Sequence, residues 1–278
     1  MSRILHRPGR VLATALCLAG IAAAGCSAQQ PAQHFHTPRP EGGAADPTAG
    51  DTATGTPPLG AAPPHLDGAA RGKTIMVVGD SWAANLAQGM SAVTSGHTTV
   101  VNAGLGGCGI RLPAGDDVPA RCRTWLKDWP SYLKKYQPDA TILMVGYWDV
   151  EPQRLTAKAE PKDLTSPLHR AAFAANLDHA VDLLTTSGKT VYLMTSPLIA
   201  NSPLRDSARA MNQVLRAADQ KREDVKLLDV AGQLCNNAAC PKVIRGISAY
   251  DPTRHLTPPA RDRIATWALN TVFTRSES

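Results

Sequence analysis

Apolar residues recur along the chain in five short continuous runs, each bounded by turn-forming residues. The runs are rich in β-branched residues and leucine, and they occupy residues 74–78, 98–102, 140–145, 190–194 and 225–230. Continuous apolar runs of this length are typical of parallel strands that are buried on both faces. The pattern therefore predicts five parallel strands.

Amphipathic patterns with helical spacing lie between these runs and after the last of them. They occupy residues 83–94, 124–136, 168–187, 207–221 and 258–273. Regular alternation of strand and helix predicts an α/β fold, a three-layer doubly wound sheet of flavodoxin-like class. Ligands of such sheets bind beyond the carboxyl ends of the strands, so chemistry-bearing residues are sought there.

The first 26 residues have the pattern of an export signal. Arg3, Arg7 and Arg10 precede an apolar run over residues 11–24, which is too short for a comfortable membrane span. The run ends in Ala-Ala-Gly-Cys-Ser, which resembles a bacterial lipobox and implies cleavage before Cys26 and lipidation of its sulfur. An ordinary cleaved signal is the alternative. Either way we expect an exported protein, lipid-anchored to the outer face of the bacterial cell membrane or secreted.

Residues 27–72 are rich in proline, glycine and alanine and show no hydrophobic period. This composition predicts a disordered tether between the signal (residues 1–26) and a folded domain that spans residues 73–278. The net charge of +6 includes the three arginines of the signal; without them 26 basic residues face 23 acidic ones. No basic run with interleaved aromatic residues is present, so we do not expect a nucleic-acid partner.

Four cysteines follow the signal segment: Cys108, Cys122, Cys235 and Cys240. An even number in an oxidising compartment indicates disulfides, and four cysteines allow three pairings. We favour Cys108–Cys122 and Cys235–Cys240, because these pairs close short local loops. A zinc site is the alternative, but the spacing lacks a Cys-x-x-Cys pair with nearby histidines. No metal or organic cofactor is expected.

Gly-Asp-Ser-Trp stands where the first strand ends and the first helix begins, and it places Ser81 at the carboxyl edge of the sheet. A helix N-terminus offers free N–H groups and partial positive charge to a serine that must carry a negative intermediate. A nucleophilic serine also needs a base. An ordinary helix cap made by Asp80 and Ser81 is the other reading of this stretch.

Three further candidates follow later strands. Gly104 comes after the second strand, where its N–H can approach a ligand closely and donate to an oxyanion, although glycine turns are common there. Gly146 begins the turn after the third strand, and Trp148 in that turn is a candidate pocket wall. His255 lies in the loop before the last helix, and Asp251, four residues earlier, is positioned to hold its Nδ1–H.

Taken in order, these blocks resemble the SGNH (GDSL-type) hydrolase superfamily over roughly residues 73–273. The resemblance implies that Ser81 is the nucleophile and His255 the general base. It also implies that the amides of Ser81 and Gly104 form the oxyanion hole, with Gly146 and Trp148 at the substrate.

The Gly-Asp-Ser-Trp and Gly-Tyr-Trp-Asp blocks, with the paired cysteines before His255-Leu-Thr, are similar to the extracellular SGNH domain of membrane acyltransferases of envelope polysaccharides. No further apolar span follows the signal, so the expectation is an SGNH domain standing alone on a lipid anchor, with a membrane acyltransferase as a candidate partner.

Two positions depart from the superfamily pattern. The superfamily has an asparagine where Trp148 stands, and the loss of one oxyanion donor typically costs about 10²–10³ in rate. The superfamily also places the acid three residues before the histidine, where this chain has Pro252, so that Asp251 lies one step further away.

The expected function is that of a serine esterase or O-acyltransferase that acts on acyl groups, with acetyl as the first choice, of cell-envelope glycans. A non-catalytic glycan-binding accessory lipoprotein is the main alternative, motivated by the shifted acid and the missing asparagine. A lipase or thioesterase is a weaker one, since the aromatic content of 5% gives no sign of a long acyl groove.

Overall fold

The computed structural model describes residues 65–112, 119–199, 202–235, 240–244 and 246–275. The predicted signal segment, Cys26 and the predicted tether as far as residue 64 lie outside the described residues. None of the helices in the described ranges is long and apolar enough to cross a bilayer.

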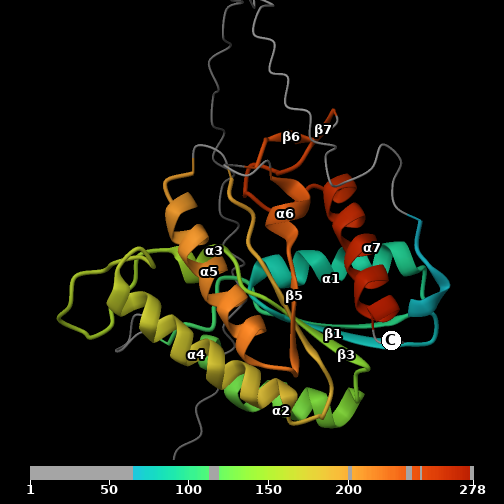
Figure 1. The fold of residues 1–278 in the computed structure, drawn as a ribbon, viewed down its shortest axis with the longest axis horizontal. Coiled ribbons are helices and arrows are strands. Elements are labelled where there is room, and N and C mark those ends of the chain that lie inside the picture. Colours follow the sequence, from blue (N-terminus) through green and yellow to red (C-terminus); the bar gives the residue numbers. More distant parts are fainter. Residues whose placement is uncertain (1–64, 113–118, 200–201, 236–239, 245, 276–278) are drawn as a thin grey trace, which may run out of the picture. The chain divides into compact units, whose positions relative to one another are not determined.

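Five parallel strands form the central sheet in the order β2-β1-β3-β4-β5 (Figure 1). They are β1 Thr74–Gly79, β2 Thr99–Gly104, β3 Ala140–Met144, β4 Val191–Met194 and β5 Val225–Leu228. Each strand matches one of the five apolar runs to within two residues at either end. This order is the doubly wound, flavodoxin-like one, so the predicted fold class is confirmed.

Five long helices also match the predicted ones closely: α1 Ser81–Thr94, α2 Trp125–Tyr136, α4 Pro167–Thr185, α5 Arg205–Lys221 and α7 Pro258–Arg275. The short elements were not predicted: 3₁₀ turns at Gly68–Ala70 and Ala120–Arg123, helices α3 Tyr147–Val150 and α6 Val230–Leu234, and the antiparallel pair β6 Val243–Ile244 and β7 Ile247–Ser248. Both short helices directly follow the carboxyl ends of strands.

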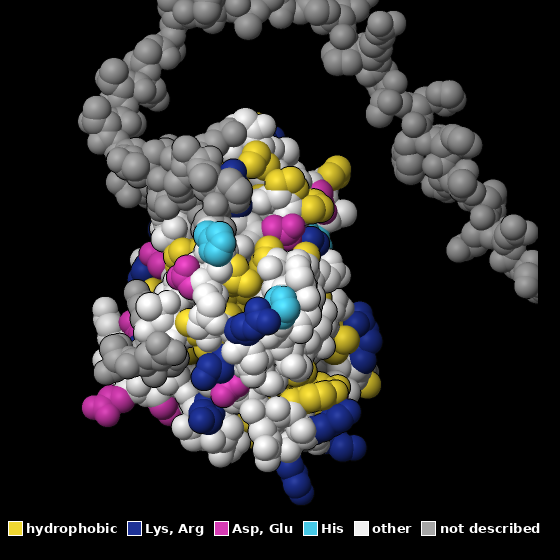
Figure 2. All heavy atoms as spheres, turned by 90° about the vertical axis from the view of Figure 1, so that its right-hand side faces the viewer, with side chains coloured by type: hydrophobic (Ala, Val, Ile, Leu, Met, Phe, Trp, Pro, Cys, Tyr) yellow, Lys and Arg dark blue, Asp and Glu magenta, His cyan; other side chains and the backbone are white. Residues whose placement is uncertain are grey.

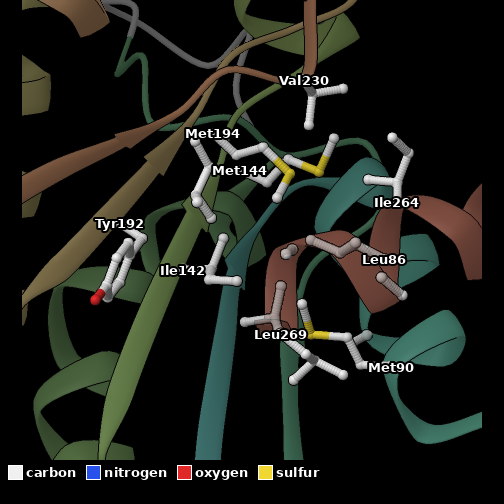
Figure 3. Packing of buried hydrophobic residues seen from close by; sticks show 14 of the residues in the cluster. Leu86, Met90, Ile142, Met144, Tyr192, Met194, Val230, Ile264 and Leu269 are labelled. Carbon is white, nitrogen blue, oxygen red and sulfur yellow. The ribbon is translucent and has the colours of Figure 1, made fainter. Parts of the chain in front are cut away.

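Helices α1 and α7 pack side by side on one face of the sheet. Alternate strand residues such as Ile142 and Met144 point into this layer, where Figure 3 shows them against Leu86 of α1 and Ile264 of α7. All four side chains are fully buried. The nucleophile candidate begins α1, so this packing fixes the helix that carries it.

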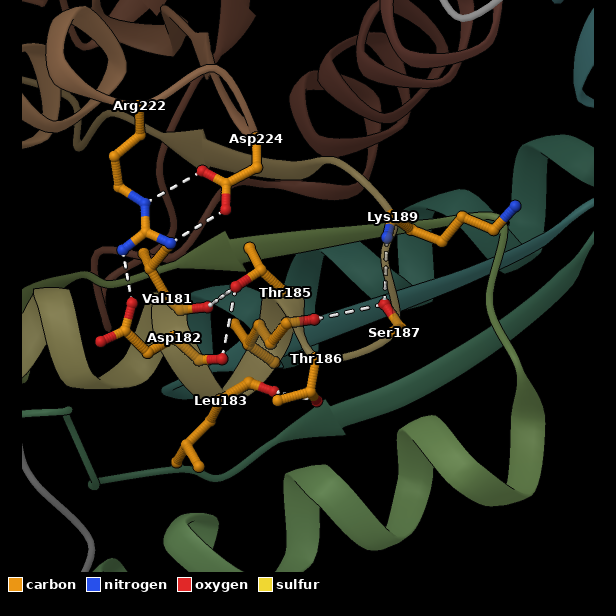
Figure 4. A network of polar contacts seen from close by, with 10 residues as sticks. Val181, Asp182, Leu183, Thr185, Thr186, Ser187, Lys189, Arg222 and Asp224 are labelled. Carbon is orange, nitrogen blue, oxygen red and sulfur yellow. Dashed lines mark hydrogen bonds and ion pairs between the residues drawn. The ribbon is translucent and has the colours of Figure 1, made fainter.

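Helices α2, α4 and α5 cover the opposite face, where the intervening strand residues meet them. Arg222, at the end of α5, bonds Asp224 just before β5 and Asp182 on α4 (Figure 4). These contacts lie at the amino ends of the strands, opposite the edge where the site is expected. Basic and acidic side chains are interspersed over the face that Figure 2 shows.

Residues 65–72, which sequence analysis assigned to the tether, pack on the folded domain. The amide of Asp67 donates to Asn270 Oδ1 on α7 at 3.0 Å, and Ala70 is buried in the α1–α7 core. Thr98 donates its hydroxyl to the Ala70 carbonyl at 2.7 Å. The packed chain therefore starts by residue 65, earlier than the composition indicated.

Two disulfides are present in the described residues, Cys108–Cys122 and Cys235–Cys240. The first joins the segment after β2 to the turn before α2. The second is held to the segment after β4, since the Cys240 amide donates to the Leu198 carbonyl at 2.7 Å. Both disulfides thus brace loops that follow the carboxyl ends of strands.

Candidate active site

The turn after β1 is shaped by close backbone packing against β3. Gly79 has φ of +134°, and a Cβ there would lie 1.9 Å from the Met144 carbonyl oxygen, so only glycine fits. Asp80 follows as the N-cap of α1, its Oδ1 accepting the Trp82 amide at 2.8 Å. Ser81 is thereby placed in the first turn of α1 at the carboxyl edge of the sheet. The two interpretations of this stretch, a helix cap and a nucleophilic serine, are therefore compatible.

His255 reaches this edge from a tight loop between β7 and α7. Within the loop, the Asp251 amide donates to the His255 carbonyl at 2.9 Å, and the Arg254 amide donates to the Asp251 carbonyl at 2.9 Å. The imidazole Nε2 lies 2.8 Å from Ser81 Oγ, although the two residues are 174 positions apart in sequence. Both side chains are half-buried. A substrate can therefore reach the pair from solvent.

The expected contact between Asp251 and the imidazole is not what the structure contains. His255 Nδ1 lies 2.7 Å from the Thr253 hydroxyl, and that hydroxyl donates to Asp251 Oδ1 at 2.6 Å. The same oxygen also accepts the amides of Thr253 at 2.8 Å and of His255 at 3.1 Å. With one additional residue between acid and base, residues 251–255 form a turn in which the Asp251 carboxylate accepts bonds from the turn itself. The Thr253 side chain therefore lies between the carboxylate and the imidazole.

Gly104 lies where the predicted oxyanion donor should be, but its amide has a partner. A Cβ on Gly104 would lie 2.4 Å from the Ala84 nitrogen, so the end of β2 presses on the first turn of α1. The Gly104 N–H donates to Asn102 Oδ1 at 3.1 Å. The Asn102 side chain is exposed, so it has to turn away before Gly104 can donate to a substrate oxygen.

Gly146 and Trp148 reach the site through their backbone. Gly146 lies against the Trp82 ring, with no room for a side chain, and the Trp148 amide donates to Asp80 Oδ2 at 3.4 Å. The cap of α1 therefore also holds the start of α3. The Trp148 side chain is half-buried, and among the described contacts none joins its ring to Ser81 or His255.

Two buried carboxyls lie under the site, of which sequence analysis named Asp80 only as a helix cap and gave Asp149 no role. Asp80 is 1% exposed, and burial, with the nearby Asp149 charge as a second cause, raises its pKa to about 7. Burial also raises the pKa of Asp149 to about 6, against the opposing effect of bonds from the Ile110 and Arg111 amides. The sequence signal was that each acid follows a buried strand and a glycine: Asp80 comes directly after Gly79, and Asp149 comes three residues after Gly146.

Two further features lie next to residues of the site, one at the His255 loop and one at Gly104. The Arg254 guanidinium lies over the Tyr147 ring, 4.7 Å from its centroid, and bonds the Tyr147 hydroxyl, so it links the His255 loop to α3. A cavity of about 160 Å³ opens beside Gly104, between β2 and α2. Its lining includes Trp125 and Asp128 on α2.

A serine hydroxyl on an imidazole nitrogen, at the carboxyl edge of a five-stranded parallel sheet, is the arrangement used by α/β serine hydrolases. The chain belongs to the SGNH family: the family model described as "SGNH domain (fused to AT3 domains)" matches residues 48–207. The matched segment contains Ser81 and Gly104 and ends before His255.

Solved structures with related folds share little sequence with this chain. The inhibitor-bound form of an aryl esterase from M. smegmatis is 15% identical, with a TM-score of 0.50 over 73% of this chain and 99% of that one. A carbohydrate acetylesterase from Sinorhizobium meliloti is 16% identical, with a TM-score of 0.49 over 73% and 99%.

A lipopolysaccharide acetyltransferase periplasmic domain from Salmonella ser. Paratyphi A is 14% identical, with a TM-score of 0.45 over 76% of this chain and 86% of that one. A search of curated proteins gave no match. At 15% identity, the likeness to the aryl esterase supports the α/β fold alone. The family model carries the assignment to the SGNH family, and the substrate has to be argued from the site.

Proposed function

We propose that this protein is an extracytoplasmic serine esterase or O-acyltransferase that acts on acyl groups, acetyl first among them, of cell-envelope glycans. The observation that carries the proposal is the 2.8 Å contact between Ser81 Oγ and His255 Nε2. This distance is within the range required for a base to take the serine proton. Membership of the SGNH family supports the same chemistry.

The proposed reaction follows from this contact. Ser81 Oγ attacks the ester carbonyl while its proton passes to His255 Nε2, and His255 then returns the proton to the departing sugar oxygen. The oxyanion that forms faces the start of α1, where the Ser81 amide is a donor at the positive end of the helix. The Gly104 amide joins it when Asn102 turns away. Water or a second sugar hydroxyl then releases the acyl group from Ser81.

Two features support a location outside the cytoplasm. The disulfides Cys108–Cys122 and Cys235–Cys240 suit an oxidising compartment. The sequence before residue 27 has the pattern of a lipoprotein signal with Cys26 as the acceptor. A glycan of the envelope is then the ester-bearing polymer within reach, and a membrane acyltransferase is a candidate source of acyl groups.

The proposal is tested with a fluorophosphonate probe, which forms a bond from phosphorus to the activated serine oxygen and releases fluoride. Intact and peptide mass spectrometry should find one adduct, on Ser81. Ser81→Ala should abolish it, and His255→Ala should slow labelling and the hydrolysis of 4-nitrophenyl acetate by about 10³-fold or more. Ser91→Ala, an exposed serine later on α1, is the matched control.

A folded wild-type protein that takes no adduct at Ser81 would contradict catalysis. Glycan-binding assays would then test the accessory role, in which binding is insensitive to the Ser81→Ala change. Separation of hydrolysis from transfer needs one further comparison, in which an acetylated donor is incubated with and without a glycan acceptor and both free acetate and acetylated acceptor are measured.

A further inference from the structure

We propose that Thr253 is a positioning residue that bridges Asp251 and His255 and fixes the proton on His255 Nδ1. The inference rests on the proposed function, since it assigns a role to Thr253 in the activation of Ser81. It replaces a direct contact between carboxylate and imidazole with a contact through one hydroxyl. Sequence analysis did not single out Thr253, because its place between Asp251 and His255 in sequence does not show that its hydroxyl lies between them in space.

The count of hydrogens around the Thr253 hydroxyl fixes the direction of each bond. A hydroxyl has one hydrogen to donate, and an ionised carboxylate can only accept. The bond from the Thr253 hydroxyl, together with the amide donors, lowers the pKa of Asp251, so its carboxylate is ionised at neutral pH. The Thr253 hydrogen therefore points to Asp251 Oδ1, 2.6 Å away.

The remaining contact of the hydroxyl must then be one in which it accepts. His255 Nδ1, 2.7 Å away, is the donor and carries a hydrogen. In a neutral imidazole the other nitrogen is unprotonated, so Nε2 presents a lone pair to Ser81 Oγ at 2.8 Å. This is the tautomer that a general base for Ser81 requires.

No proton is transferred along Thr253 during the reaction. When the Ser81 proton reaches Nε2, the imidazolium still donates from Nδ1 to the Thr253 oxygen, and Thr253 still donates to Asp251. The negative charge of Asp251 stabilises the imidazolium through the polarised hydroxyl. The bridge also orients the ring, because the backbone amides of Thr253 and His255 hold the carboxylate oxygen that accepts the Thr253 hydroxyl.

The chain contains a matched control for this motif. Asp163 and Thr165 have the same spacing as Asp251 and Thr253, and Asp163 Oδ1 accepts the Thr165 amide at 2.9 Å and its hydroxyl at 2.5 Å. Among the described contacts none joins the Thr165 hydroxyl to a histidine. Thr165→Val therefore removes the same local bond without touching the site, and both threonines are exposed.

The experiment compares the wild-type chain with Thr253→Val, Thr253→Ser and Thr165→Val in two measurements. The first is the rate of fluorophosphonate labelling at Ser81. The second is the ¹⁵N chemical shifts of the His255 ring, assigned by their loss in His255→Ala, which report the tautomer without reference to activity.

We expect labelling of Thr253→Val to fall about 10²-fold, the low end of what a positioned general base contributes. Its His255 shifts should move from the Nδ1–H form toward a mixture of tautomers. Thr253→Ser should restore both the rate, to within about 3-fold of wild type, and the tautomer. Thr165→Val should match the wild type in both measurements.

Asp251→Ala adds a test of the bridge itself. If Asp251 acts through Thr253, the double variant Asp251→Ala/Thr253→Val should label no more slowly than the slower single variant, because both changes break one path. Multiplicative losses would overturn the bridge and assign Asp251 a separate route to the ring.

The outcomes distinguish this inference from the proposed function. A wild type that labels at Ser81, with Thr253→Val unchanged in rate and in ring shifts, would overturn the bridge and leave the esterase proposal intact. A wild type that does not label at all would overturn the proposed function, and the ring shifts would still decide whether Thr253 holds the Nδ1 hydrogen.

Discussion

Gly79 lies at a point where the neighbouring strand leaves no space for a side chain. Its φ of +134° belongs to a region that other residues rarely adopt, and the Met144 carbonyl occupies the place of a Cβ. The consequence reaches the next two residues, because the direction of the chain at Gly79 decides where Asp80 caps and where Ser81 projects. The glycine that begins the Gly-Asp-Ser-Trp block is therefore required by the packing of β1 against β3, which in turn places Ser81.

Gly79→Ala should lower the free energy of unfolding by about 3 kcal/mol or more, since backbone strain and overpacking add. Gly188→Ala is the matched control, because Gly188 also has a positive φ, +69°, but no atom lies within 4 Å of an added Cβ. We expect it to cost only about 1 kcal/mol. Urea denaturation of both variants measures the difference, and equal losses would show that the contact with Met144 contributes nothing.

At the scale of elements, two buried carboxyls hold the start of α1, the start of α3 and the segment after β2. Asp80 accepts the amides of Trp82 on α1 and Trp148 on α3, and Asp149 accepts the amides of Ile110 and Arg111 from the segment after β2. These bonds join three loops at the carboxyl edge of the sheet. The arrangement holds the three loops together, but it buries two acids close to each other. Ionisation of either acid therefore lowers the stability of the folded state.

This cost predicts a pH dependence of stability. The pKa values of Asp80 and Asp149 are about 7 and about 6 in the folded chain, against the ordinary 3.8. The folded state therefore binds more protons than the unfolded state between these values. The contribution of the two groups to stability is full below pH 3.8 and is lost as the pH rises through 6 to 7.

Asp80→Asn keeps an oxygen for the Trp82 amide and removes the ionisation. Relative to wild type, its free energy of unfolding should rise as the pH increases from 5 to 8. Guanidinium titrations at several pH values measure this, with Asp139→Asn as the control, an exposed carboxylate that accepts the Thr74 amide. A difference between Asp80→Asn and wild type that stays constant with pH would contradict the assignment.

The long elements could be predicted from sequence because each leaves a repeated signal. A strand buried on both faces needs a continuous apolar run, and a surface helix needs a periodic one, so β1 to β5 and the five long helices were found. Helices α3 and α6 span four and five residues, too few to show a period. Residues 65–72 pack through backbone groups and small side chains, which composition alone does not distinguish from a tether.

The candidate site was predictable to the extent that topology determines it. Ser81 follows from the rule that chemistry gathers at the carboxyl edge of the sheet, and His255 follows from the resemblance to the SGNH superfamily; the structure brings the two together. The place of Thr253 on Nδ1 and the Asn102 partner of Gly104 depend on rotamers within short turns. No pattern of residue types along the chain records such contacts.

At the scale of the whole molecule, the proposed arrangement is a catalytic domain on a lipid anchor. Cys26 precedes the packed chain by 39 positions, counted to residue 65, where the described domain begins. The intervening segment is rich in proline and glycine, the composition from which a tether is predicted. An esterase held in this way would act on glycan near the membrane surface.

Cys26→Ala should release the protein from membranes and leave the fluorophosphonate reaction of Ser81 unchanged. Metabolic incorporation of an alkyne-bearing fatty acid and fractionation measure lipidation and release, and fluorophosphonate labelling of the released protein measures the reactivity of Ser81. Cys17→Ala is the control within the same signal segment. Fatty-acid labelling that persists in Cys26→Ala would contradict the lipidation site. A wild-type protein that takes up no fatty acid and is found in the soluble fraction would indicate an ordinary cleaved signal.

The 174 positions between Ser81 and His255 also bear on when the site can form. When a chain crosses a membrane with its amino terminus first, Ser81 emerges long before His255. The hydroxyl then has no base until His255 has emerged and α7, which follows His255 in the chain, has packed on α1. If the protein is exported unfolded, Ser81 is therefore not activated while the chain crosses the membrane. Reaction of Ser81 with the probe then reports that synthesis, export and folding are complete.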